Sequence, residues 1–139
     1  MVAEDAEYER LPVGRLLRYC SRYANRHGAF VGVFGLVNVL GRHGMLTPAE
    51  ERFRRENNAW YDAAYPDPTR TNPKAYEHPR TASWFRSSPA SAPLLTRLPG
   101  YLAILDSHRV AWRRITTDDP GDVVYEDEFQ VVAVPRAEP

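Results

Sequence analysis

The stretch from Thr47 to Pro68, TPAEERFRRENNAWYDAAYPDP, predicts the best-defined helix of the chain. Thr47 is placed to cap the first turn, Pro48 stands where a missing N–H costs nothing, and Glu50 falls three residues after the cap, as in a capping box. Apolar residues then follow helical spacing along one face. The helix has to end before Pro66, because a residue that precedes proline disfavours the helical conformation.

The outer face of this helix is predicted to be charged and solvated. Glu50 with Arg54, and Glu51 with Arg55, are acid–base pairs four residues apart with the acid on the N-terminal side. Each pair is worth about 0.3 kcal/mol. Capping, pairing and packing therefore explain the first half of the helix, whereas the amides, the acid and the aromatic residues of its second half exceed what these effects require.

The segment before this helix is predicted to be a second, buried helix. Phe30–Arg42 places apolar residues at helical spacing, and Arg42 and His43 precede Gly44, which is a C-terminal cap with cations at the negative end of the helix dipole. The short connection to Thr47 predicts an αα-hairpin. Further upstream, the segment 14–23 fits either a strand or a helix, and its tyrosines and flanking glycines favour a strand.

The chain after the central helix is predicted to be mainly β. Residues 66–80 contain four prolines and predict irregular structure, which in a compact domain is often functional. A short strand is expected over 81–86 and a helix over 91–108 that continues across Pro99 with a kink. Three further strands are expected at 110–117, 122–125 and 130–134, the last two forming a hairpin around Asp127 and Glu128.

These elements predict an α+β fold with a single domain over residues 10–135. We expect an antiparallel sheet of about four to five strands, with a mixed sheet as the alternative, and an αα-hairpin and a third, proline-kinked helix on one face. Residues 1–9 are acidic and aperiodic and are expected to be a frayed terminus, and residues 136–139 a C-terminal tail.

Composition narrows the classes of function. The 139 residues carry no net charge, so no overall field attracts nucleic acid or membranes, and neither is expected as a partner. The apolar run at 29–40 is too short to span a bilayer and starts too late for a signal peptide. A single cysteine, Cys20, suits a reducing compartment, so a cytoplasmic location is predicted. An anionic small molecule or a protein partner fits this composition, and so does a homodimer.

Neither a metal site nor a cofactor is predicted. The four histidines are scattered, and Cys20 has no cysteine partner at metal-binding spacing. The glycines at 28, 32 and 35 do not match a phosphate-binding loop.

The N-terminal part of the chain is basic. From Arg10 to Leu46 there is no acidic residue, and Tyr19 and Tyr23 alternate with arginines. Guanidinium groups beside aromatic planes can contact phosphates and bases, so nucleic-acid binding through this segment is one alternative function. The same charge asymmetry also suits a pocket for a small anion, for which Arg22 is a candidate ligand-binding residue.

Aromatic and amide side chains gather around the end of the central helix and the later 81–86 strand. Pockets combine apolar walls with a few placed polar groups, and this region supplies both. The main expectation is therefore a binding or interaction module with an aromatic and amide-lined pocket, whether or not it turns a substrate over. Besides Arg22, the predicted ligand-binding residues are Asn57, Trp60, Asp62, Tyr65, Trp84 and Arg86.

A third set of residues suggests an enzyme. Arg18 on the first strand, Ser83 within Thr81-Ala82-Ser83, and Glu126-Asp127-Glu128 follow one another in the chain. This order resembles the Arg, Ser and Glu-x-Glu motifs of ADP-ribosyltransferases, and the resemblance covers these three short motifs. It implies that Arg18 and Ser83 position a dinucleotide and that Glu128 polarises the acceptor or the ribose. The alternative to a binding module is thus a small enzyme that acts on an anionic or nucleotide-like substrate.

Overall fold

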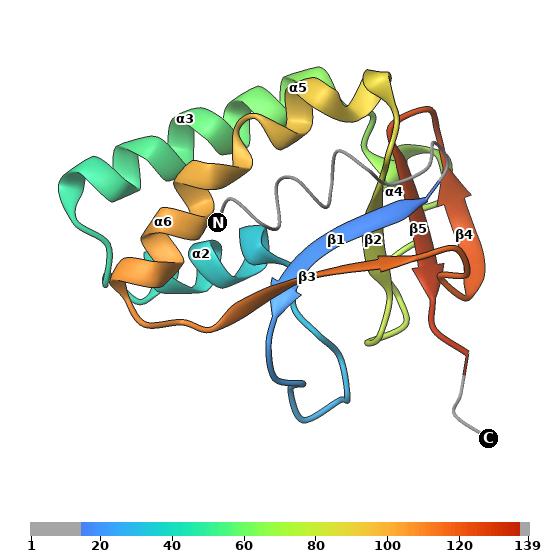
Figure 1. Cartoon of the computed structure of the whole chain (residues 1–139), viewed down its shortest axis with the longest axis horizontal. Coiled ribbons are helices and arrows are strands. Elements are labelled where there is room, and N and C mark those ends of the chain that lie inside the picture. The colour runs from blue at the N-terminus through green and yellow to red at the C-terminus, as the bar shows by residue number, and fades with distance from the viewer. Residues whose placement is uncertain (1–14, 137–139) are drawn as a thin grey trace.

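The computed structural model describes residues 15–136 and shows a single α+β domain, as predicted. A five-stranded sheet lies beside a layer of helices (Figure 1). The expected frayed terminus at 1–9 and the last three residues of the expected tail, 137–139, lie outside the described residues.

Each pair of neighbouring strands is antiparallel, and the strand order is β3-β1-β2-β5-β4. The segment that fits either a strand or a helix forms β1, and the hairpin predicted around Asp127 joins β4 to β5. The strands are β1 (Leu16–Ser21), β2 (Ala82–Arg86), β3 (Trp112–Thr117), β4 (Asp122–Glu126) and β5 (Gln130–Val134).

The helices confirm the αα-hairpin and correct two details. Residues 66–80 are not wholly irregular, because Asp67 caps the single helical turn α4 by accepting from the Thr69 amide. The helix expected over 91–108 is interrupted at Thr96 and Arg97, but both keep right-handed helical angles, so the apolar face continues. The helices are α2 (Val33–Arg42), α3 (Pro48–Ala64), α4 (Pro68–Thr71), α5 (Ala92–Leu95) and α6 (Leu98–Ser107), with a 3₁₀ turn at Pro89–Ser91.

The predicted capping box is present at the start of α3. The Glu50 amide donates to Thr47 Oγ1 at 3.1 Å, and the Thr47 amide donates to Glu50 Oε1 at 2.9 Å. The predicted pairing of Glu50 with Arg54 is wrong, since Glu50 bonds instead to His108 Nε2 at 2.9 Å, just beyond α6. Arg54 turns to Glu51, which also pairs with Arg55 at 3.4 Å as predicted.

Glu50 should make the stability of the domain depend on pH. The hydrogen bond from His108, followed by that from the Thr47 amide, lowers the pKa of Glu50 from 4.5 to about 2. The ionised form is therefore favoured in the fold, and this stability is present above pH 4.5 and lost as pH falls from 4.5 towards 2. After discounting for solvent, we expect a loss of about 1–2 kcal/mol, measured by urea unfolding across this range.

The Glu50→Gln variant should remove most of this pH dependence. Glu56→Gln is the matched control, because Glu56 is exposed on the same helix and has no described ion pair. If the Glu50→Gln variant and the native protein lost stability in parallel below pH 4.5, Glu50 would not be the group responsible.

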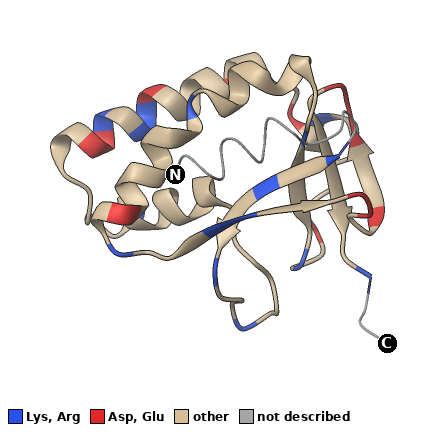
Figure 2. Cartoon of the chain, viewed as in Figure 1, with Lys and Arg blue, Asp and Glu red and all other residues tan. Residues whose placement is uncertain are grey.

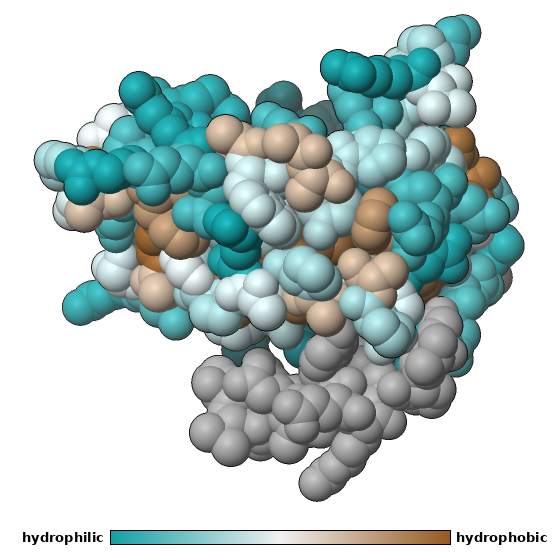
Figure 3. Space-filling model, turned by 90° about the horizontal axis from the view of Figure 1, so that it is seen from above, coloured by the Kyte–Doolittle hydropathy of each residue, from teal (hydrophilic) through white to brown (hydrophobic). Residues whose placement is uncertain are grey.

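An aromatic core joins the helices to the sheet. Tyr101 on α6 is fully buried. The centre of its ring lies 4.8 Å from that of Phe34 on α2 and 5.1 Å from that of Phe53 on α3, and both pairs pack edge to face. Its hydroxyl donates to Asn58 Oδ1 at 2.7 Å, so no polar group of the ring is left unpaired. Seen from above, hydrophilic residues prevail at the left of the surface, and hydrophobic patches lie across its middle (Figure 3).

Candidate functional site

β1 and β2 separate part-way along the sheet, and the candidate site lies at this split. Their ladder contains the pairs Leu16–Arg86 and Leu17–Phe85, after which the strands diverge (Figure 1). β1 continues to pair with β3 on its other side. The segment 29–32 takes the place of β2 beside the end of β1, where the Ser21 amide donates to the Val31 carbonyl at 2.7 Å and Cys20 bridges to Gly32.

Arg18 fills the gap between the separated strands. Its Nε donates to the Ser83 carbonyl of β2 at 3.2 Å, and its Nη1 donates to the Phe30 carbonyl of the inserted segment at 2.9 Å. The side chain therefore replaces part of the missing ladder. These contacts use two of the five N–H groups of the guanidinium.

The charge of Arg18 is buried without a counter-ion among the described residues. Only 8% of the residue is exposed, and no ion pair to a described carboxylate is present. Burial lowers the pKa of Arg18, but an arginine keeps its proton in proteins. Since an uncompensated buried charge is costly, this position calls for an anion.

A cavity of about 230 Å³ adjoins Arg18. Besides Arg18, it is lined by Tyr19, Gly32, Phe34, Tyr76, Thr81, Ser83, Trp84, Phe85 and Gln130. Tyr19, Phe34 and Phe85 also pack against the core, so they form rigid apolar walls. The cavity is smaller than the roughly 300–1,000 Å³ pockets that hold drug-sized ligands, so a smaller molecule is required.

The polar groups of this cavity are mainly donors. The Tyr76 hydroxyl and Ser83 Oγ lie 2.9 Å apart, and burial raises the pKa of Tyr76, which keeps its proton in place. Trp84 Nε1 is buried with no hydrogen-bond partner among the described residues. None of the described residues that line the cavity carries a carboxylate. Together with Arg18, these groups favour a ligand that presents anionic oxygen atoms.

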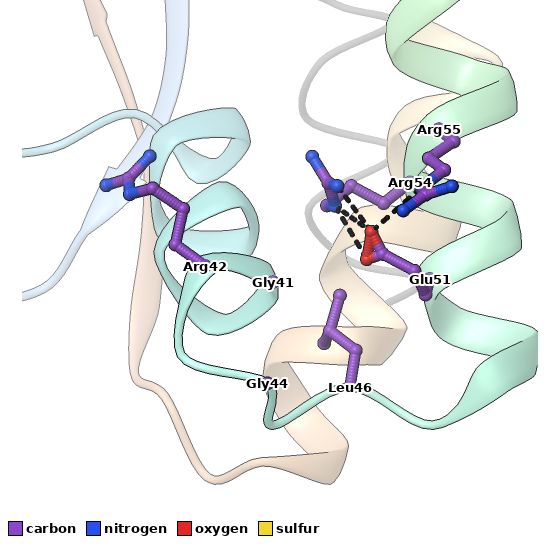
Figure 4. A pocket seen from close by; sticks show the side chains of 7 residues that line it. All are labelled: Gly41, Arg42, Gly44, Leu46, Glu51, Arg54 and Arg55. Carbon is purple, nitrogen blue, oxygen red and sulfur yellow. Dashed lines mark hydrogen bonds and ion pairs between the residues drawn. The ribbon is translucent and has the colours of Figure 1, made fainter.

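A second cavity, of about 340 Å³, lies at the α2–α3 corner and is a weaker candidate (Figure 4). Arg54 and Arg55 point towards Glu51, which pairs with both, whereas Arg42 points away. The charges of Arg54 and Arg55 are thus already shared with an internal carboxylate. Within residues 15–136, no aromatic side chain lines this cavity, and Leu46 is its one apolar side chain.

The predicted pocket wall at the end of α3 is occupied by internal contacts. Asn57 is buried, donates to the Phe53 carbonyl at 2.8 Å and accepts from Arg97 Nη1 at 2.9 Å. The Arg97 guanidinium also lies 4.0 Å from the centre of the Trp60 ring. Tyr65 packs on Phe129 at 4.9 Å. These side chains hold the helices and the β4–β5 turn together, and none of them lines the Arg18 cavity.

The other predicted ligand-binding residues are spread over the surface. Arg22 is exposed in the loop after β1, and Asp62 is exposed on α3. Arg86 donates to the Asp127 carbonyl at 2.7 Å and pairs with Glu126 at 3.1 Å, so it holds the β4–β5 turn. Trp84 is the member of the predicted set that lines the cavity.

Two residues of the ADP-ribosyltransferase-like order come together, and the third does not. Arg18 donates to the Ser83 carbonyl, and both residues line the cavity. Glu128 is exposed in the β4–β5 turn and is not part of the cavity lining. The structure thus places Arg18 and Ser83 in one site and leaves Glu128 outside it.

Several residues that line the cavity were not predicted to be site residues. Phe34 has the spacing of an ordinary core residue, and Gln130 begins a strand, so neither carries a local signal of function. Tyr76 had a signal, since it stands in the proline-rich segment where functional loops are common.

Neither similarity to known proteins nor a metal-binding cluster points to another site among the described residues. No protein-family model, curated protein sequence or solved structure matches the chain. Within residues 15–136, no group of three or more His, Cys, Asp or Glu side chains could hold a metal ion. None of the described helices is long and apolar enough to cross a membrane.

Proposed function

We propose that this protein is a binding domain for a small anionic molecule, held in the cavity between β1 and β2. The observation that carries the proposal is Arg18, an arginine that is 8% exposed and lacks a described counter-ion. A carboxylate or phosphate group of the ligand would pair with the Arg18 N–H groups that have no partner among the described residues.

The rest of the ligand is expected to be small and apolar or aromatic. Phe34 and Phe85 offer ring faces and edges against which a flat group can pack. An aromatic acid such as benzoate combines a flat ring with a carboxylate and matches both parts of the site.

A thermal-shift measurement with benzoate and benzamide tests this proposal. Both molecules have the same ring, but benzamide has no charge, so benzoate should raise Tm and benzamide should not. A ligand present at a hundred times its Kd adds about 2.7 kcal/mol to the stability of the fold. Phenyl phosphate and inorganic phosphate then distinguish the preferred anion and the contribution of the ring.

The variants Arg18→Gln and Gly32→Ala should each weaken benzoate binding more than tenfold, which is about 1.4 kcal/mol. Gln removes the charge but can still donate to a neighbouring carbonyl. A Cβ at Gly32 would lie 3.6 Å from Arg18 Nη2, an ordinary contact that occupies the space beside the guanidinium without straining the fold. Arg55→Gln is the control, because that side chain is 76% exposed and does not line the cavity.

Unfolding curves separate loss of binding from loss of structure. Gly32→Ala should keep the native Tm without ligand, because the backbone angles of Gly32, φ −62° and ψ 152°, suit any residue. Benzoate binding that is equal in the native protein and in both variants would refute the assignment of the site.

A further inference from the structure

The loop between β1 and α2, residues 22–32, is held in one conformation by its own hydrogen bonds. Asn25 Oδ1 accepts from the His27 amide at 2.9 Å and from the Ala29 amide at 3.0 Å, and the Asn25 amide donates to the Ala29 carbonyl at 2.8 Å. Gly28 adopts the positive φ of 75° that closes the turn. The loop projects beyond the sheet as a preorganised finger (Figure 1).

The finger presents an aromatic ring between two arginines. Tyr23 is 74% exposed, the most exposed of the large hydrophobic residues described. Arg22 and Arg26 are also exposed, and the described side-chain contact of Arg26 is with His27. No acidic residue occurs between Arg15 and Leu46. The loop below β1 accordingly shows blue segments and no red ones in Figure 2.

Two more arginines lie against the finger. The Arg113 guanidinium sits 4.4 Å above the Phe30 ring, and a Cβ at Gly28 would lie 3.9 Å from Arg80 Nε. The Nε atoms of both arginines are buried without a hydrogen-bond partner among the described residues. None of the four arginines, Arg22, Arg26, Arg80 and Arg113, pairs with a described carboxylate. The chain is neutral overall, yet the charged side chains of the finger itself are all basic.

We propose that this finger binds single-stranded nucleic acid. An exposed ring beside guanidinium groups matches a strand that offers both bases to stack and phosphates to pair with. An acidic protein surface would pair with the arginines but would not account for the exposure of Tyr23. The overall neutrality of the sequence predicts no nucleic-acid partner. The electrostatic field at the finger, however, is set by the charges that cluster there.

Fluorescence anisotropy with a labelled twelve-nucleotide single strand of mixed sequence, as DNA and as RNA, tests the proposal. Binding at 50 mM salt should weaken as salt rises. The double variant Arg22→Gln/Arg26→Gln should lower affinity at least tenfold and reduce the slope of log K against log salt by about 1.4, since each phosphate contact to a single strand contributes roughly 0.7. Tyr23→Ala should lower affinity about tenfold through lost stacking.

The controls distinguish binding at the finger from a general attraction between opposite charges. Arg52→Gln/Arg55→Gln removes the same charge from exposed positions on α3 and should leave affinity unchanged. Absence of binding at 50 mM salt would overturn the proposal. Equal binding of a polyglutamate of the same length, together with an unaffected Tyr23→Ala variant, would also overturn it and indicate an acidic protein partner. This test is independent of the small-ligand pocket, because none of Arg22, Tyr23 and Arg26 lines that cavity.

Discussion

The Tyr101→Ala variant should lose about 4 kcal/mol of the free energy of unfolding. The ring of Tyr101 is fully buried and contacts aromatic rings from α2 and α3, so its removal leaves a cavity that rigid neighbours cannot fill. The change also removes the donor of Asn58 Oδ1. Because a domain is stable by only about 5–15 kcal/mol in total, chemical denaturation should show a much lower midpoint.

Two further variants separate the contribution of the Tyr101 hydroxyl group from that of ring burial. Tyr101→Phe keeps the packing and should cost about 1–2 kcal/mol, the cost of an unpaired buried acceptor. Tyr23→Ala makes the same truncation at a 74% exposed position and should change stability by less than about 0.5 kcal/mol. Similar losses in the Tyr101→Ala and Tyr23→Ala variants would show that the aromatic cluster is not the core.

The Gly121→Ala variant should be destabilised by about 3 kcal/mol. Gly121 immediately precedes β4 and has a φ of 112°, a conformation that residues with a side chain rarely adopt. An added Cβ would also run into the Val134 carbonyl and lie 2.8 Å from Pro135 Cα, and this backbone cannot move without opening the β4–β5 pair. Thermal unfolding measured by circular dichroism reports the loss.

Gly44→Ala provides the matched control for this prediction. Gly44 also has a positive φ, 67°, but nothing lies within 4 Å of the added Cβ. Only backbone strain remains, so a loss of about 1 kcal/mol is expected. If both alanine variants were equally stable, contact with Val134 would contribute nothing.

The sequence predicted those elements whose signals are local. Thr47 and Glu50 are three residues apart and make the capping box by themselves, and Gly44 ends α2 with a positive φ as a C-terminal cap should. The polar groups of Asp127 likewise build the turn between β4 and β5, since its Oδ1 accepts from the amides of Phe129 and Gln130. Such contacts lie within a few residues and can be inferred without the fold.

Partners distant in the chain could not be predicted. The spacing predicts that Glu50 pairs with Arg54. The packing of α6 instead brings His108 next to Glu50, and its Nε2 hydrogen-bonds to the Glu50 carboxylate. The packing of α3 alone does not require the amide of Asn57. It is present because Asn57 Oδ1 accepts a hydrogen bond from Arg97, which immediately precedes α6. A surplus of polar groups on a helix therefore indicated a long-range structural contact rather than a ligand.

The candidate pocket illustrates the same limit. Arg18 and Ser83 were candidates through the resemblance to ADP-ribosyltransferases and Trp84 through the aromatic cluster, and the fold brings all three to one cavity. The cavity itself exists because β1 and β2 separate after two pairs and the segment 29–32 enters between them. No periodicity in the sequence indicates where two strands of a sheet part.

The most direct test of the small-anion site is an NMR titration of ¹⁵N-labelled protein with benzoate. The chain has three tryptophans, and Trp112 Nε1 already donates to Asp106 at 2.8 Å, while Trp60 lies beneath Arg97. We predict that the indole N–H of Trp84 and the Nε–H of Arg18 shift together along one saturation curve, while the other two indole signals stay in place. Unchanged Arg18 and Trp84 signals at saturating benzoate would contradict the proposed binding site.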